Sequence, residues 1–398
     1  MPHAAESLLN ELVALTETLQ IPVVGSEIVQ VRDISPRYYL GSGKADEVAA
    51  RVAEVEANLV VFDIELSPSQ QRNWEQLAGC AVTDRHGVIL EIFAARAQTR
   101  EAHLQVELAR LEYLLPRLTS AWSHLSRQRG GRRGTRGEGE TQLEVDRRIV
   151  QQRIASMRRE LKGVRGHRAT MRKQRTNESI PAGSIVGYTN AGKSSLLRAL
   201  TGSDVIVADQ LFSTLDPATR RLELDGGQAV LLTDTVGFIR RLPHGLVDAF
   251  KSTLEETVLA QFLVHVVDAS DPAAMEHARI TREVLGEIGS SDKPTITVLN
   301  KVDLVSKETR PIIGAELADA VQVSAITGDG LDALCEAIRA VVTDQYSRIT
   351  VSIPHDRYDL AALIHRTGRV IQEDYEADLI RIEAEVPERT RRIVDDHG

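Results

Sequence analysis

The sequence predicts an α/β protein built around a doubly wound domain, with a small α/β domain and a long helical hairpin before it and a small α+β domain after it. Three observations support this prediction. Four polar segments each follow an apolar run of strand length between residues 184 and 326. Apolar residues repeat in steps of three and four between residues 104 and 171. Residues 1–98 alternate helix-like and strand-like patterns. We therefore expect domains at 1–98, 99–178, 179–342 and 343–398.

Composition and charge limit the partners of this 398-residue chain. No apolar stretch approaches the roughly 20 residues that span a bilayer, and the N-terminus lacks a signal pattern. We expect a cytoplasmic protein with no membrane span, and Cys80 and Cys335 as core residues. The net charge is −9, but residues 127–176 hold 16 Lys/Arg against 5 Asp/Glu. This +11 segment on a body of −20 favours an RNA-contacting arm, and a solvated basic helix face is the alternative.

The first 98 residues predict helices near 5–19, 44–57 and 68–78 and strands near 28–32, 59–64 and 81–83. Gly41-Ser-Gly-Lys44 precedes a helix and lacks the rest of a nucleotide fingerprint, so a turn with an N-cap is favoured over an anion site. Ser67-Pro68 is typical of a helix start. These patterns together predict a small α/β domain.

The next 80 residues predict two long helices with matching apolar seams. One seam runs from Leu104 to 125 and the other from Val150 to Met171. A connection of about 13 residues makes an antiparallel hairpin. We define the hairpin tip as 127–143; its five arginines are Arg127, Arg129, Arg132, Arg133 and Arg136. Its glycines deny it a fixed structure, so we expect it to order on RNA, with a solubilising loop as the alternative.

The segment Gly187-Tyr-Thr-Asn-Ala-Gly-Lys193-Ser194 lies between a buried-strand pattern and a helix pattern. Its glycines let backbone N–H groups and a helix N-terminus point at one anion. Lys193 then supplies a charge to the phosphates and Ser194 contributes through Mg2+. Taken alone, this octet also occurs in ATPases and kinases.

Three further segments follow in order. Asp234-Thr-Val-Gly237 places a carboxylate at a strand end near Mg2+ and a glycine beside the γ-phosphate. In Asn300-Lys-Val-Asp303 the aspartate can accept from the N1–H and 2-amino group of guanine, which adenine lacks. Ser324-Ala-Ile326 would offer backbone N–H groups to the guanine oxygen. The four segments predict a P-loop GTPase domain that binds GTP and GDP.

The polar connection 209–221 is long enough to close over the γ-phosphate and is the candidate switch. Thr214 would coordinate Mg2+ in the triphosphate state and lose this contact after hydrolysis. Thr219 is the competing ligand, because Pro217 separates the two and spacing does not decide between them.

Hydrolysis needs a charge and an oriented water. Phe238 stands where many GTPases have a water-orienting glutamine, so we expect slow hydrolysis by the protein alone. Asn190 is similar to the asparagine of GTPases that use K+ as the catalytic cation. The intramolecular alternatives are Arg220, Arg221, Arg240 and Arg241.

The expected site falls into three groups. The metal ligands are Ser194 and Thr214, and the residues with a part in hydrolysis are Lys193, Thr214, Asn190 and Gly237. The nucleotide-binding residues are Gly187, Tyr188, Thr189, Asn190, Ala191, Gly192, Lys193, Ser194, Phe212, Ser213, Thr214, Leu215, Asp216, Asp234, Thr235, Val236, Gly237, Asn300, Lys301, Val302, Asp303, Ser324, Ala325 and Ile326.

The C-terminal residues predict a strand at 350–354, a helix near 357–368 and strands at 370–372 and 378–386. This order is typical of a small α+β domain.

Over nearly its whole length the chain resembles the HflX family of ribosome-associated GTPases. The segments that carry the resemblance are Leu66-Ser-Pro-Ser-Gln70, Thr99-Arg-Glu-Ala-His-Leu-Gln-Val-Glu-Leu-Ala-Arg-Leu111, Gly134-Thr-Arg-Gly-Glu-Gly-Glu-Thr-Gln-Leu-Glu144, the 187–194 octet, Phe212-Ser-Thr-Leu-Asp-Pro217 and Asp234-Thr-Val-Gly-Phe238. Two positions depart from the family pattern: Glu138 replaces a proline, and Arg132-Arg133 replaces a more neutral pair.

The resemblance implies binding to the large ribosomal subunit and its RNA, through the basic hairpin and the N-terminal domain. It further implies splitting or rescue of stalled ribosomes under stress, hydrolysis of ATP as well as GTP, and Ser194 and Thr214 as Mg2+ ligands. We expect the free protein to be monomeric. Two alternatives from other classes are an ATP-driven RNA-remodelling enzyme and a nucleotide-gated scaffold with little turnover.

Overall fold

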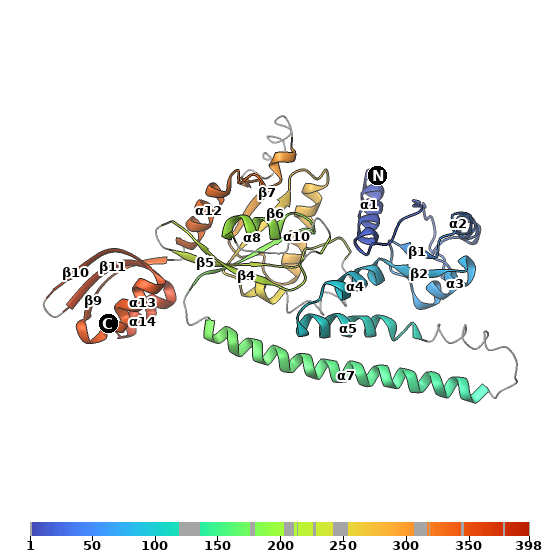
Figure 1. Cartoon of the computed structure of the whole chain (residues 1–398), viewed down its shortest axis with the longest axis horizontal. Helices are drawn as coiled ribbons and strands as arrows, with labels where there is room; N and C mark the ends of the chain where they lie inside the picture. Colours follow the sequence, from blue (N-terminus) through green and yellow to red (C-terminus); the bar gives the residue numbers. More distant parts are fainter. Residues whose placement is uncertain are drawn as a thin grey trace. The chain divides into compact units, whose positions relative to one another are not determined.

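The computed structural model describes residues 2–118, 136–175, 180–202, 211–212, 214–225, 228–241, 254–305, 317, 319–343, 346–376 and 379–397. The chain forms two compact units (Figure 1). The first contains the described residues up to Val164 together with Leu211, Phe212 and Arg241. The second contains the other described residues.

The first unit begins with a small α/β domain. Its elements are α1 (Pro2–Thr18), α2 (Ser42–Glu54), β1 (Leu59–Phe62), α3 (Pro68–Ala78), β2 (Ala81–Asp84) and α4 (Arg85–Arg96). Strands β1 and β2 pair in parallel, with Leu59 opposite Ala81. Trp74 is fully buried and its ring packs against Tyr38 and Phe62. Helix α3 begins at Pro68 with Ser67 as its N-cap, as the sequence predicts.

Two features of this domain differ from the sequence prediction. No strand forms at 28–32, where Ile28 is 48% exposed. A β-strand needs a hydrogen-bonding neighbour, and in the described residues β1 and β2 pair only with each other. Helix α4, which the sequence analysis missed, buries Ile89 and Phe93. Lys44 pairs with Glu27 and Glu47, so the Gly41-Ser-Gly-Lys44 turn offers no free cation to an anion.

The helical hairpin consists of α5 (Arg100–Leu114) and α7 (Arg136–Arg175). The predicted seam is confirmed, because Leu108, Ile154 and Leu161 are buried in one cluster. Ion pairs Arg100–Glu160 and Arg158–Glu112, both at 2.6 Å, join the two helices in antiparallel order.

The ends of the two helices differ from the prediction. Helix α5 ends at Leu114 instead of continuing to 125, because Pro116 has no N–H and its ring clashes with the preceding turn. Helix α7 begins at Arg136, so the second half of the tip is helical despite its glycines. Acidic residues such as Glu138 favour a helix N-terminus. The tip arginines 127, 129, 132 and 133 lie outside the described residues.

The second unit contains a six-stranded sheet in the order β4-β5-β3-β6-β7-β8. Its elements are β3 (Ala182–Gly187), α8 (Lys193–Thr201), β4 (Ala218–Glu223), β5 (Ala229–Asp234), β6 (Phe262–Asp268), α10 (Ala274–Glu287), β7 (Thr295–Asn300), a 3-10 turn at Val302–Leu304, β8 (Val321–Gln322) and α12 (Leu331–Thr343). Strand β4 is antiparallel to β5, and the other pairs are parallel. Because parallel strands end at one edge, the segments after β3, β5, β7 and β8 meet there.

The C-terminal part of the second unit is an antiparallel sheet in the order β10-β11-β9. Its elements are β9 (Tyr346–Pro354), a 3-10 turn at His355–Arg357, α13 (Tyr358–Thr367), β10 (Arg369–Tyr375), β11 (Leu379–Pro387) and α14 (Glu388–His397). Ile353, Ile364 and Ile382 are fully buried between sheet and helices. The α+β prediction is confirmed, and α14 is an addition to it.

Candidate nucleotide-binding site

The loop between β3 and α8 has the backbone of a phosphate cradle. Gly187 and Gly192 have φ angles of 152° and 87°, values that side chains disfavour. A Cβ atom at Gly187 would overlap the carbonyl oxygen of Val266, and one at Gly192 would overlap the side chain of Asn300. Both positions therefore require glycine. The loop leads directly into α8, whose first residue is Lys193.

Lys193 is buried within this loop. Its Nζ donates to the carbonyl oxygens of Gly187 (3.1 Å) and Tyr188 (2.7 Å). Burial lowers the pKa of Lys193 to about 8, although the Asp234 carboxylate opposes the shift. The cation is thus held inside the cradle by its own backbone.

Three oxygen atoms from three elements converge beside Lys193. Ser194 Oγ donates to Asp234 Oδ2 at 2.6 Å, and Thr214 Oγ1 donates to the same oxygen at 2.8 Å. The two hydroxyl oxygens are 2.7 Å apart. Asp234 Oδ1 is buried and has no hydrogen-bond partner among the described residues. Hard oxygen donors with an unsatisfied carboxylate oxygen fit a Mg2+ ion with its water shell.

The competing threonine lies elsewhere. Thr219 is on β4, and its hydroxyl pairs with that of Thr233 on β5 at 2.9 Å. Of the two switch threonines, only Thr214 therefore contacts the carboxylate at the strand end.

Burial raises the pKa of the Asp234 carboxyl. The charge of Lys193 and the hydrogen bonds from the hydroxyls of Ser194 and Thr214 act in the opposite direction.

The segment after β5 runs beside the phosphate loop. Thr189 N donates to Phe238 O at 2.7 Å, and Phe238 N donates to Gly187 O at 3.0 Å. A Cβ atom at Gly237 would lie 2.7 Å from Thr189 Cα and 3.0 Å from Lys193 Nζ, so this close approach requires glycine. The Phe238 ring is 1% exposed and belongs to the interior.

The four arginines considered as catalytic cations are engaged with other groups. Arg220 donates to Thr219 O, and Arg221 pairs with Glu223. Arg240 pairs with Glu276 at 3.5 Å. Within the first unit, Arg241 pairs with Asp63 at 3.2 Å.

The segments after β7 and β8 form the other half of the site. Asn300 Nδ2 donates to Ala191 O at 3.0 Å, and Asn300 Oδ1 accepts from Ala325 N at 3.1 Å. Asn300 thereby joins the phosphate loop to the segment after β8. Asp303 is exposed and makes no ion pair among the described residues, so its carboxylate is accessible to a ligand.

Two details of this half were not predicted from the sequence. Lys301 has a φ of 63° and pairs with Asp268 at 2.7 Å. Asp268 ends β6 at the edge of the sheet where the nucleotide segments lie. This position after an apolar strand is the sequence signal that could have identified Asp268 as a site residue. Ser324 N donates to Asp329 O and Ala325 N to Asn300 Oδ1, so of the three expected N–H donors only that of the exposed Ile326 has no acceptor among the described residues.

The remaining switch residues have different positions. Phe212 is buried in the first unit, where its ring lies edge-on to Phe93 at 4.6 Å. Leu215 is buried and Asp216 half-buried in the second unit. Ser213 lies outside the described residues. The structure therefore brings Thr214 to Asp234, whereas Phe212 is a packing residue.

Comparison with known proteins gives matches along the chain. Residues 6–94 match the family described as GTP-binding GTPase N-terminal, 96–175 the GTP-binding GTPase Middle Region, 183–301 the 50S ribosome-binding GTPase, and 314–396 the HflX C-terminal domain. The protein "GTPase HflX" of Akkermansia muciniphila is 49% identical over 394 residues, with 96% of this chain and 90% of that protein covered. The chain belongs to the HflX family of GTPases. As a member of that family it is a GTP-hydrolysing enzyme.

Two further proteins are similar to this HflX-family GTPase. GTPase HflX of Escherichia coli strain K12 is 42% identical, with 94% of this chain and 86% of that protein covered. A solved GTP-binding protein from Sulfolobus solfataricus in complex with GDP is 27% identical, covers 85% of this chain and 97% of its own, and has a TM-score of 0.46. In the portion of the chain that the structure describes, no helix is both long and apolar enough to cross a membrane.

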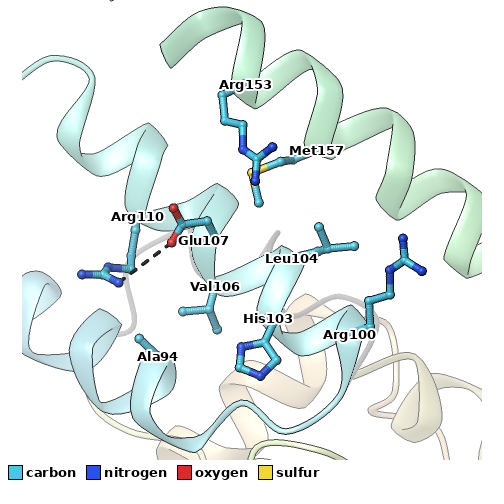
Figure 2. Close-up of a pocket in the computed structure, with 9 residues that line it drawn as sticks. All are labelled: Ala94, Arg100, His103, Leu104, Val106, Glu107, Arg110, Arg153 and Met157. Carbon is cyan, nitrogen blue, oxygen red and sulfur yellow. Dashed lines mark ion pairs between the residues drawn. The ribbon is translucent and has the colours of Figure 1, made fainter. Parts of the chain in front are cut away.

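This HflX-family GTPase has a further pocket of about 590 Å³ in its first unit. Figure 2 shows Arg153 and Met157 of α7 facing the side chains of α5 across it. The lining residues are Ala94, Arg100, His103, Leu104, Val106, Glu107, Arg110, Arg153 and Met157. None of them belongs to the four nucleotide segments, and two of the three arginines are ion-paired, Arg100 with Glu160 and Arg110 with Glu91 and Glu107.

Proposed function

We propose that this GTPase binds the large ribosomal subunit and splits or rescues stalled ribosomes under stress. The match of residues 183–301 to the 50S ribosome-binding GTPase family carries this proposal. We also propose that the protein acts in the cytoplasm and is monomeric when it is free. The nucleotide state of the 209–221 switch would control how firmly the N-terminal domain and the hairpin hold ribosomal RNA.

The proposal assigns a role to each part of the nucleotide site. Lys193 holds the phosphates, Ser194 and Thr214 hold Mg2+, and Asp303 accepts from the guanine edge. The convergence of Ser194 and Thr214 on Asp234 supports the metal assignment. When bound, Mg2+ neutralises charge on the phosphate oxygens. Thr214 would hold the switch in the triphosphate state and would release it after hydrolysis.

The hydrolysis step is proposed to be slow in the free protein. The burial of Phe238 supports this, because an apolar interior ring cannot orient water. The backbone of the switch would position the water, and Asn190 would hold a K+ ion that supplies the missing positive charge. Ribosome binding would order the switch and accelerate turnover.

The hairpin is proposed as the RNA-contacting arm. Along α7, Arg148, Arg159 and Lys162 recur at spacings of 11 and 3 residues, which places them on one helix face. None of them has an ion-pair partner among the described residues. Such a row suits the phosphates of an RNA helix, where released counterions favour binding. The five tip arginines add further positive charge to the hairpin in the sequence.

Co-sedimentation with purified ribosomal subunits tests the proposal. The full-length protein is mixed with large or small subunits in GTP, GDP or a non-hydrolysable GTP analogue. We expect binding to the large subunit that is strongest with the analogue and weakest with GDP. Equal binding in all three nucleotides, or no preference for the large subunit, would contradict the proposal.

Two companion measurements separate the other function classes. Equal affinity for ATP and GTP in competition, with ATP-dependent duplex unwinding, would favour an RNA-remodelling enzyme. A GTP turnover rate that is near zero both with and without large subunits would favour a nucleotide-gated scaffold.

A further inference from the structure

Tyr188 of the phosphate loop forms a cluster with two side chains of the second unit that lie outside the four nucleotide segments. The ring of Tyr188 stacks on that of His277 from α10, with centroids 3.7 Å apart and planes 7° from parallel. Arg240 N donates to Tyr188 Oη at 2.9 Å. Arg240 Nη2 lies 3.5 Å from His277 Nε2. We call these three residues the Tyr188 clamp.

The clamp is buried and is held from several sides. Tyr188, Arg240 and His277 are all less than 9% exposed. The Arg240 guanidinium pairs with Glu276, and His277 Nδ1 lies 3.6 Å from Asp271. Buried polar contacts of this kind fix one arrangement, because breaking them leaves charged groups without water. The end of the Gly237–Arg240 segment is therefore attached to α10 as well as to the phosphate loop.

The segment that the clamp anchors lies at the phosphate end of the site. Its first half is attached to the loop by the two hydrogen bonds between Phe238 and residues Gly187 and Thr189. Gly237 lies so close to Lys193 that a Cβ atom there would be 3.0 Å from Nζ. The backbone of Gly237 and Phe238 is thus held in position by the hydrogen bonds of Phe238 to the phosphate loop and by the hydrogen bond from Arg240 N to Tyr188.

We propose that Tyr188, His277 and Arg240 are positioning residues for GTP hydrolysis. The inference rests on the proposed nucleotide site, because it takes Gly237 to lie beside the γ-phosphate. Phe238 offers no polar side chain to the water, so this segment contributes to the reaction only through its backbone, which lies at the γ-phosphate beside the switch backbone that would position the water. Their placement within a few tenths of an ångström then sets the rate. The clamp acts through Gly237 and Phe238 and contacts no reacting atom.

Three variants of the full-length protein test the clamp. Tyr188→Phe keeps the stacked ring and removes the hydroxyl that accepts from Arg240 N. His277→Ala removes the stack, and His277→Phe restores a flat ring. Arg279→Met is the matched control, because Arg279 is also on α10 but its side chain is 58% exposed and pairs with Glu283. Single-turnover GTP hydrolysis and GDP affinity are measured in KCl without ribosomes.

We expect Tyr188→Phe and His277→Ala each to slow hydrolysis by about 3- to 10-fold, the effect of one lost hydrogen bond or ring stack. GDP affinity should change less than the hydrolysis rate, and the melting temperature should fall by only a few degrees, as the loss of one buried contact implies. His277→Phe should recover most of the rate lost in His277→Ala, and Arg279→Met should change nothing.

Two results would overturn the inference. Unchanged hydrolysis in both Tyr188→Phe and His277→Ala would show that the segment is placed without the clamp. GDP affinity that falls by the same factor as hydrolysis would show a purely structural role. Because ribosomes are absent, a failure of the proposed ribosome association leaves these readouts intact.

Discussion

His265 makes the stability of the nucleotide domain depend on pH. It lies in the central strand β6, is 3% exposed, and its Nε2 has no hydrogen-bond partner among the described residues. Burial lowers its pKa from 6.5 to about 4, and the charges of Arg282 and Lys193 act in the same direction. The folded protein therefore keeps this imidazole neutral in mildly acidic solution.

The sign and size of the effect follow from proton linkage. In the unfolded chain His265 takes up a proton as the pH falls through 6.5, whereas in the folded protein it does so only near pH 4. The contribution of neutral His265 to the unfolding free energy is complete above pH 6.5 and is lost as the pH falls toward 4. The slope is about 1.4 kcal/mol per pH unit, and the total is about 3 kcal/mol.

The variant His265→Leu keeps a side chain of similar size and removes the titration. As the pH falls from 6.5 to 4, wild type loses stability that the variant keeps. We therefore expect the unfolding free energy of His265→Leu to increase by about 3 kcal/mol relative to that of wild type over this range. Both tryptophans, Trp74 and Trp122, precede the nucleotide domain in the sequence, so their fluorescence does not report on β6. Hydrogen exchange of β6 peptides in a urea series, measured at several pH values, provides the readout.

The control replaces an exposed histidine. His355→Leu alters a residue of the C-terminal part and should leave the pH dependence of β6 exchange as in wild type. Parallel pH profiles for wild type and His265→Leu would refute the reasoning, because they would mean that His265 titrates alike in the folded and unfolded chains.

Three further predictions concern ligands. Asp303→Ala should weaken GTP binding far more than ATP binding, by roughly 1.5–3 kcal/mol for each of two lost hydrogen bonds, and equal losses in a competition assay would show that Asp303 does not read the base. Replacing the five tip arginines by alanine should weaken ribosome binding and flatten its salt dependence while nucleotide affinity stays constant; an unchanged slope would make the tip a solubilising loop. Hydrolysis should be faster in KCl than in NaCl, and Asn190→Ala should abolish the difference. Identical single-turnover rates in both salts would leave an arginine as the source of charge.

The sequence by itself determined the order of the nucleotide segments and the strands before them. These signals are local, because a buried strand is an apolar run and a tight phosphate loop needs glycine at 187 and 192. The seam of the hairpin was equally readable, since Ile154 and Leu161 are one heptad apart on α7 and Leu104, Leu108 and Leu111 follow steps of four and three on α5. The switch threonine was not readable, because Thr214 and Thr219 are close in sequence and chemically alike.

Only the tertiary structure decided questions that depend on distant partners. It paired Thr214 with Asp234, 20 residues away, and left Thr219 on the sheet. It left 28–32 without a strand, because propensity cannot supply a neighbour to hydrogen-bond. It also stacked Tyr188 on His277, 89 positions apart in the printed sequence, a contact with no sequence signal. Local patterns specify elements, whereas the contacts that join the elements arise only when the chain packs them together.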